Sequence, residues 1–71
     1  MKLYDVFGAE AREIIGKCWG ALENGKEYTD RDLDKIAEAL TDYLLTHGIE
    51  NDEENEVGVV CVNALNAMAD L

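Results

Sequence analysis

The sequence predicts an all-α protein, a small antiparallel three-helix bundle formed by one domain over residues 1–71, and we expect it to dimerise. Apolar residues recur at helical spacing in three segments, and glycine-containing stop signals separate them. The chain has no proline to interrupt a helix. Connections of about five residues favour antiparallel neighbours. Because so short a chain builds only a small core, a partner subunit is a common supplement.

The first helix is expected from about Leu3 to Glu23, ending at Asn24-Gly25, since glycine commonly follows the last helical residue. Its apolar face would consist of Leu3, Phe7, Ala11, Ile14, Ile15, Cys18 and Leu22. Gly16 and Gly20 lie one turn apart, which indicates either close approach of another helix or local flexibility.

The second helix is expected to start after Thr29, which we predict to be its N-cap, and to stop at His47-Gly48. Acidic residues in the first turn suit the positive end of the helix dipole. The predicted core positions are Leu33, Ile36, Ala37, Leu40 and Leu44.

The third helix is expected to follow an Asn51-Asp52 cap and to run to about Asp70. The segment Val57–Val62 could instead be a short buried strand, but the helix-forming residues after it favour a helix, and a lone strand would lack a partner. The predicted apolar side of this helix contains Val57, Cys61, Ala64, Leu65 and Met68. Its whole apolar arc is wider than a surface helix needs. The helix therefore lies between both others or contacts a second subunit. That subunit interface would contain Val59, Val62, Leu65 and Ala69.

Charge is distributed unevenly along the chain, whose formal net charge is −10. No lysine or arginine follows Lys35, whereas eight acids do. Such a surface repels nucleic acid and anionic membranes and attracts basic proteins. We therefore expect no direct contact with nucleic acid or membrane.

Acidic residues of the second helix recur at four-residue intervals, which places one carboxylate about every 6 Å along a single stripe. The following loop adds a second acidic patch, and Leu45 falls within the stripe as an apolar anchor or as a leucine covered by a loop. The predicted partner-binding residues are Asp30, Asp34, Glu38, Asp42, Leu45, Glu50, Glu53 and Glu54. The alternative is a solvated face that serves solubility alone, as in proteins adapted to high salt.

Catalysis is not expected. The chain has no serine, which excludes serine nucleophiles and the serine-linked prosthetic group of acyl carrier proteins. Cys18 and Cys61 lie on core faces, and His47 is the only histidine. The run Asp30-x-Asp32-x-Asp34 lacks the glycine and the final glutamate of a calcium loop. We expect no cofactor and no metal.

The N-terminal residues lack the apolar run of a secretory signal, so we expect a cytoplasmic protein. These observations predict a non-catalytic acidic binding module or inhibitor that acts on a basic partner protein. A nucleic-acid-binding partner would be engaged by mimicry of DNA. In size and charge the chain resembles the small acidic anti-restriction and anti-CRISPR proteins of phages, with which it shares no motif. The alternative is an assembly subunit that oligomerises through the third helix.

Overall fold

A computed structural model describes all residues 1–71, and 59% of them are helical. The three helices are α1 (Ala9–Cys18), α2 (Asp30–His47) and α3 (Glu56–Ala69). Between α2 and α3, β1 (Ile49–Glu50) and β2 (Glu53–Glu54) form an antiparallel hairpin. The prediction of a mainly helical protein is confirmed, but the all-α class is wrong in detail because it omits this hairpin.

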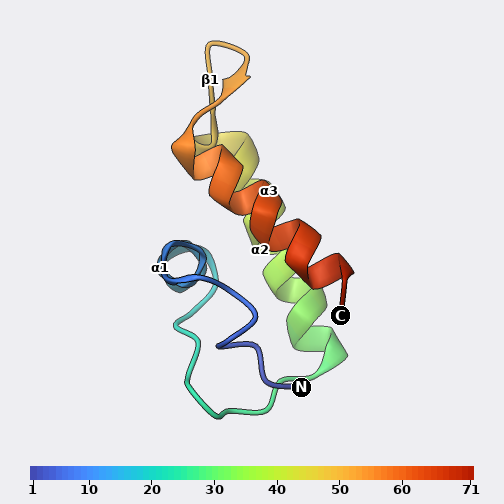
Figure 1. The fold of residues 1–71 in the computed structure, drawn as a ribbon. Helices are drawn as coiled ribbons and strands as arrows, with labels where there is room; N and C mark the ends of the chain where they lie inside the picture. Colours follow the sequence, from blue (N-terminus) through green and yellow to red (C-terminus); the bar gives the residue numbers. More distant parts are fainter.

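The helix pair α2 and α3 forms the long axis of the molecule, which measures 38 × 19 × 19 Å. Figure 1 shows these two helices side by side with the hairpin projecting beyond one end, whereas α1 is seen end-on. The predicted antiparallel arrangement therefore holds for α2 and α3, whereas α1 lies across them. The N-terminus and the α1–α2 connection lie at the end opposite the hairpin.

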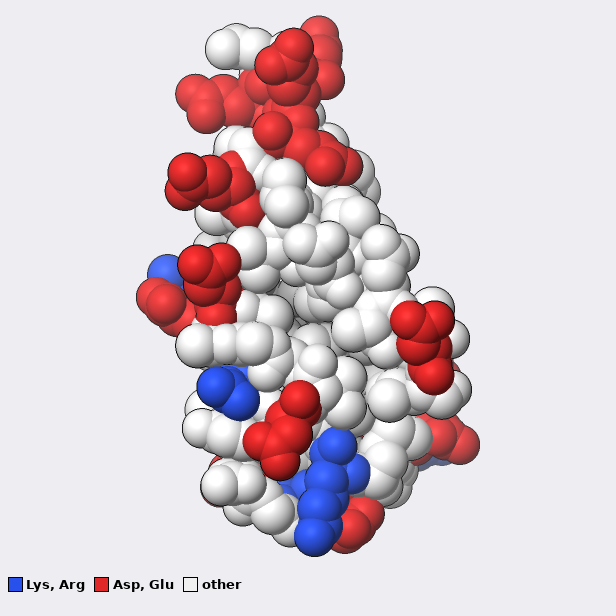
Figure 2. Space-filling view, viewed as in Figure 1, with Lys and Arg blue, Asp and Glu red and all other residues white.

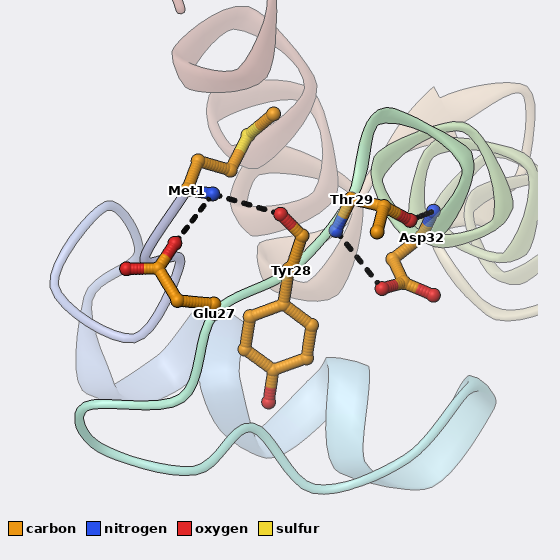
Figure 3. Close-up of polar contacts among 5 residues, drawn as sticks. All are labelled: Met1, Glu27, Tyr28, Thr29 and Asp32. Atoms are coloured by element: carbon orange, nitrogen blue, oxygen red, sulfur yellow. Dashed lines mark hydrogen bonds and ion pairs between the residues drawn. The ribbon is translucent and has the colours of Figure 1, made fainter.

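The start of α2 agrees with the sequence. Thr29 is its N-cap, and its hydroxyl accepts a hydrogen bond from the Asp32 N–H at 3.2 Å. The Asp32 carboxylate in turn accepts from the Thr29 N–H at 3.0 Å, completing a capping box (Figure 3).

The predicted bounds of the first helix are wrong at both ends, because α1 covers only residues 9–18. Gly8 is extended, with φ −71° and ψ 171°, and the chain before it pairs with the segment before α2. Lys2 bridges Glu27, and the Tyr28 N–H donates to the Met1 carbonyl oxygen at 2.6 Å. These contacts hold the first residues beside the segment before α2. The chain then turns, and the Val6 N–H donates to the Leu3 carbonyl oxygen at 3.1 Å in place of a helical i→i−4 bond.

The predicted cap of the third helix is also wrong. Asn51 and Asp52 have φ of 53° and 65°, so they form the hairpin turn, in which asparagine and aspartate tolerate positive φ. The N-cap of α3 is Asn55, whose side-chain oxygen accepts from the Gly58 N–H at 2.9 Å. The Val57–Val62 segment is helical, as expected.

The glycines that permit close packing are not those the sequence suggested. Gly16 has only the Ala21 Cα near its missing Cβ, at 3.9 Å, and Gly20 has open space there. A Cβ on Gly58 would overlap the Gly48 carbonyl oxygen, and a Cβ on Gly48 would lie 2.8 Å from the Gly58 Cα. This backbone contact joins the end of α2 to the start of α3.

A single hydrophobic core lies among the three helices. Eleven of its twelve buried residues were predicted, and Tyr28 is the addition. Its members are Leu3, Phe7, Ala11, Ile14, Ile15, Leu22, Tyr28, Ile36, Leu40, Cys61, Ala64 and Met68. The helix α3 packs against both α1 and α2, which accounts for its wide apolar arc.

Candidate binding surface

The acidic stripe, defined as Asp30, Asp34, Glu38 and Asp42, is exposed throughout. The buried residues of α2, Ile36 and Leu40, lie on its opposite side. Leu45 is 65% exposed, so no loop covers it and it stands within the stripe as an apolar side chain. Because α2 has 18 residues, the surface that contains the stripe is about 27 Å long.

The hairpin extends this acidic surface beyond the end of α2. Glu50, Glu53 and Glu54 are all exposed. Glu50 and Glu53 lie directly opposite each other in the ladder, a position in which like charges destabilise a hairpin. Ile49 is 43% exposed and adds an apolar side chain that the sequence did not indicate as part of a binding surface.

Neither the stripe nor the hairpin is neutralised by an ion pair. The three ion pairs join Met1 to Glu27, Lys17 to Glu13 and Lys26 to Glu23. Figure 2 shows acidic and uncharged side chains alone at the hairpin end, with basic side chains in the rest of the molecule. The negative charge of the hairpin end is therefore presented directly to solvent.

The four residues predicted for a subunit interface all lie on α3. Val59 is 46% exposed and lines a hollow near the hairpin. Leu65 and Ala69 line a different hollow of about 250 Å³ between α2 and α3, together with the stripe residue Asp34. Val62 is half-buried on α3.

A groove between α1 and α3 was not predicted. It consists of three hollows of about 200, 210 and 680 Å³, and Glu10 and Val60 line all three. Glu56 lines the two hollows nearer the hairpin. The only feature of the sequence that indicated this groove is an acid in the first turn of α1 and of α3, Glu10 and Glu56. The helix dipole also explains acids at these positions.

The thiols are poorly suited to nucleophilic chemistry. Burial raises the pKa of Cys18, and burial together with the neighbouring Cys18 raises the pKa of Cys61. Both cysteines are free. A raised pKa leaves less of the reactive thiolate at neutral pH.

Two other structural features bear on the classes of function considered. No group of three or more histidine, cysteine, aspartate or glutamate side chains is placed to hold a metal ion. None of the helices combines the length and apolar character required to cross a bilayer.

The polar contacts at the opposite end are local and structural. The Met1 amino group donates to the Tyr28 carbonyl oxygen and pairs with the Glu27 carboxylate, both at 2.8 Å (Figure 3). The hydrogen bond that the Glu27 carboxylate accepts from the Met1 amino group, and the positive charge of that group, lower the pKa of Glu27. The hydrogen bond from the Thr29 backbone is the main reason that the pKa of Asp32 is lowered.

The site therefore consists of an exposed acidic stripe, an acidic hairpin and a groove between α1 and α3, all on a compact helical domain. No protein-family model, curated protein or solved structure matches the chain.

Proposed function

We propose that this chain is a non-catalytic acidic binding module that engages a basic surface of a partner protein and acts as an inhibitor of that partner. The observation that carries the proposal is the facing pair Glu50 and Glu53 at a hairpin end without a cation. Placing like charges opposite each other opposes folding of the hairpin. Because these carboxylates destabilise the hairpin that carries them, positive charges supplied by a partner would be favourable there.

The acidic stripe supports the same proposal through its geometry. Its carboxylates follow one another about every 6 Å along α2. The phosphates of one DNA strand follow one another about every 3.4 Å, so the stripe and its neighbouring acids resemble a sparse phosphate track. Proteins that bind nucleic acid through lysine and arginine are therefore the partner class that we propose. Leu45, exposed within the stripe, would add an apolar contact.

The test is capture of an immobilised oligolysine peptide over a range of salt concentrations. Wild-type capture is expected to weaken as salt rises, because exposed charges are screened. The double variant Asp34→Lys plus Asp42→Lys should capture much less. Its matched control, Asp5→Lys plus Glu23→Lys, changes exposed acids outside the stripe and alters the net charge equally. Equal loss in both variants would reject a role for the stripe.

Mimicry of DNA has a separate test. A basic DNA-binding domain held by this chain should be released by duplex DNA, because both ligands would occupy the same basic surface. Simultaneous binding of both ligands would exclude mimicry and leave simple acidic recognition.

The second candidate is an assembly subunit that dimerises through α3, and the exposure of Val59 on that helix favours it. Sedimentation of the wild type against Val62→Glu tests this candidate. A wild type that sediments as a monomer would exclude it, whereas a dimer disrupted by the substitution would support it.

A further inference from the structure

We propose that the groove between α1 and α3 is the docking site for an amphipathic helix of the partner, with lysine or arginine at one end of its apolar face. The inference rests on the proposed function. It goes further by assigning the docking step to a face of the molecule other than the acidic stripe.

The groove is long enough for a helix. Its three hollows adjoin one another because each is lined by both Glu10 and Val60. Its lining starts at Glu54 in β2 and follows α3 as far as Ala67. The 14 residues of α3 extend about 21 Å, which matches a docked helix of three to four turns.

The part of the groove farther from the hairpin is apolar. Phe7, Ala11, Val60, Ala64 and Ala67 line it, and Glu10 is the only charged residue there. Phe7, Ala11 and Ala64 are buried and form its floor, whereas Val60 and Ala67 are partly exposed and can contact a docked helix. An apolar surface between helices is the usual receptor for an amphipathic helix.

The part nearer the hairpin is acidic. Glu10 and Glu56 line both of its hollows, joined by Glu13 in one and Glu54 in the other. The only cation is Lys17, which pairs with Glu13 at 3.6 Å. Figure 2 looks onto this face and shows uncharged surface lying between acidic side chains.

Because one part of the groove is acidic and the other is apolar, it favours a helix that is basic at one end of its apolar face. A basic residue at the hairpin end would meet several carboxylates and Tyr43, whose ring face also attracts cations. Apolar residues would fill the far end. A second copy of this chain would bring a net charge of −10 against the same carboxylates. An added β-strand is disfavoured because β1 and β2 have two residues each.

The test uses two synthetic peptides of identical composition and measures their binding kinetics. One peptide is a helix with a leucine face and lysines at one end, and the other is its scrambled form. The wild type should bind the amphipathic peptide about tenfold more tightly than the scrambled peptide, because only the first can fill both parts of the groove.

Two double variants with the same change in net charge then locate the site. Glu10→Gln plus Glu56→Gln should raise the dissociation rate of the amphipathic peptide about tenfold. Asp34→Asn plus Asp42→Asn, on the stripe, should mainly lower the association rate and its salt dependence. All four side chains are exposed, and circular dichroism verifies that each variant is folded.

A third variant tests the apolar contact without changing charge. Val60 lines all three hollows, including the apolar one, and Val60→Thr replaces one methyl group with a hydroxyl of similar size. We expect several-fold weaker binding of the amphipathic peptide and unchanged binding of the scrambled peptide. If either double variant fails to fold, this variant and the comparison of the two peptides still decide the result.

Three outcomes would overturn the inference. Equal, salt-sensitive binding of both peptides would reject the groove and leave the proposed function intact. Equal effects of the two double variants on dissociation would show that total charge matters rather than the groove. A wild type that binds neither peptide would reject the groove and the proposed function together.

Discussion

The two ends of this molecule are held together in different ways. At the end with the N-terminus, polar groups are paired: the Met1 amino group contacts Glu27 and Tyr28, and Thr29 exchanges hydrogen bonds with Asp32. At the hairpin end, the close contact is between the backbones of Gly48 and Gly58, and the surrounding acids have no cation.

The charged groups of the N-terminal end stabilise the fold, whereas those of the hairpin end do not. Opposite charges at the N-terminal end stabilise the fold locally. At the hairpin end the acids repel one another, and backbone contact has to hold the turn against that repulsion. The proposed basic partner would therefore gain most from the uncompensated charge at the hairpin end.

The largest effect is expected from Gly58→Ala. The new Cβ would overlap the Gly48 carbonyl oxygen, which belongs to the backbone and cannot rotate away. Overpacking of this kind lowers the free energy of unfolding by about 1–3 kcal/mol, a large part of the stability of so small a domain. Urea denaturation measures the change.

Gly16→Ala is the matched control for that substitution. Its Cβ would meet only ordinary contact at 3.9 Å, so the better helix propensity of alanine should raise the free energy of unfolding by about 0.5–1 kcal/mol. Opposite signs at the two glycines would establish the close contact. Destabilisation of equal size at both positions would contradict it.

Asn55→Ala is expected to have the next largest effect. Asn55 caps α3 through the Gly58 N–H, and its side-chain amide also donates to the His47 carbonyl oxygen at 2.9 Å. Loss of a cap lowers the free energy of unfolding by about 0.5–2 kcal/mol. Thr29→Ala removes a cap that makes no such second contact and should destabilise less in thermal unfolding. A larger decrease in stability for Thr29→Ala than for Asn55→Ala would show that the cap of α2 contributes more to stability than the cap of α3.

Glu53→Lys tests the repulsion within the hairpin. It replaces a facing pair of like charges with an opposite pair across from Glu50, so the free energy of unfolding should rise by about 0.2–1 kcal/mol at low salt. Capture of the oligolysine peptide should fall in the same variant. A parallel loss of stability and capture would mean that the hairpin acids are required for folding.

The smallest effect concerns Glu27 and pH. Its pKa is lowered in the folded state, so the stability that it contributes is present at neutral pH and is lost as the pH falls through that lowered value. The melting temperature of the wild type should therefore exceed that of Glu27→Gln at pH 7. The difference should close as the pH falls below the ordinary value of 4.5.

A control for the pH experiment is Glu23→Gln, whose contact with Lys26 is longer, at 4.0 Å. It should reduce the melting temperature less than Glu27→Gln at pH 7. A difference between wild type and Glu27→Gln that grows on acidification would reverse the assigned sign.

Local signals in the sequence were sufficient for α2 and for the choice of helix at Val57–Val62. The Thr29 cap lies next to its own helix, and the apolar spacing identified buried residues such as Ile36 and Leu40. The exposure of Asp34 and Asp42 also followed, because residues on the far side of an amphipathic helix face solvent.

The start of α1 could not be derived in the same way. The apolar spacing from Leu3 to Phe7 suits a helix, yet Met1 and Lys2, just before it, pair with residues 27 and 28, and residues 4–6 form a turn. Pairing with a distant segment overrides local helix preference, which is a weak determinant. The hairpin was missed because its two short strands contain mostly acids, which are uncommon in strands.

The sequence by itself determined the three helical segments, most of the core and the uneven charge, because each depends on neighbouring residues or on composition. Only the tertiary structure decided the crossing of α1, the contact of Gly48 with Gly58 and the groove shared by Glu10 and Val60. These features join residues that are far apart in the chain. The number of residues between them in the sequence does not determine the distance between them in the folded protein.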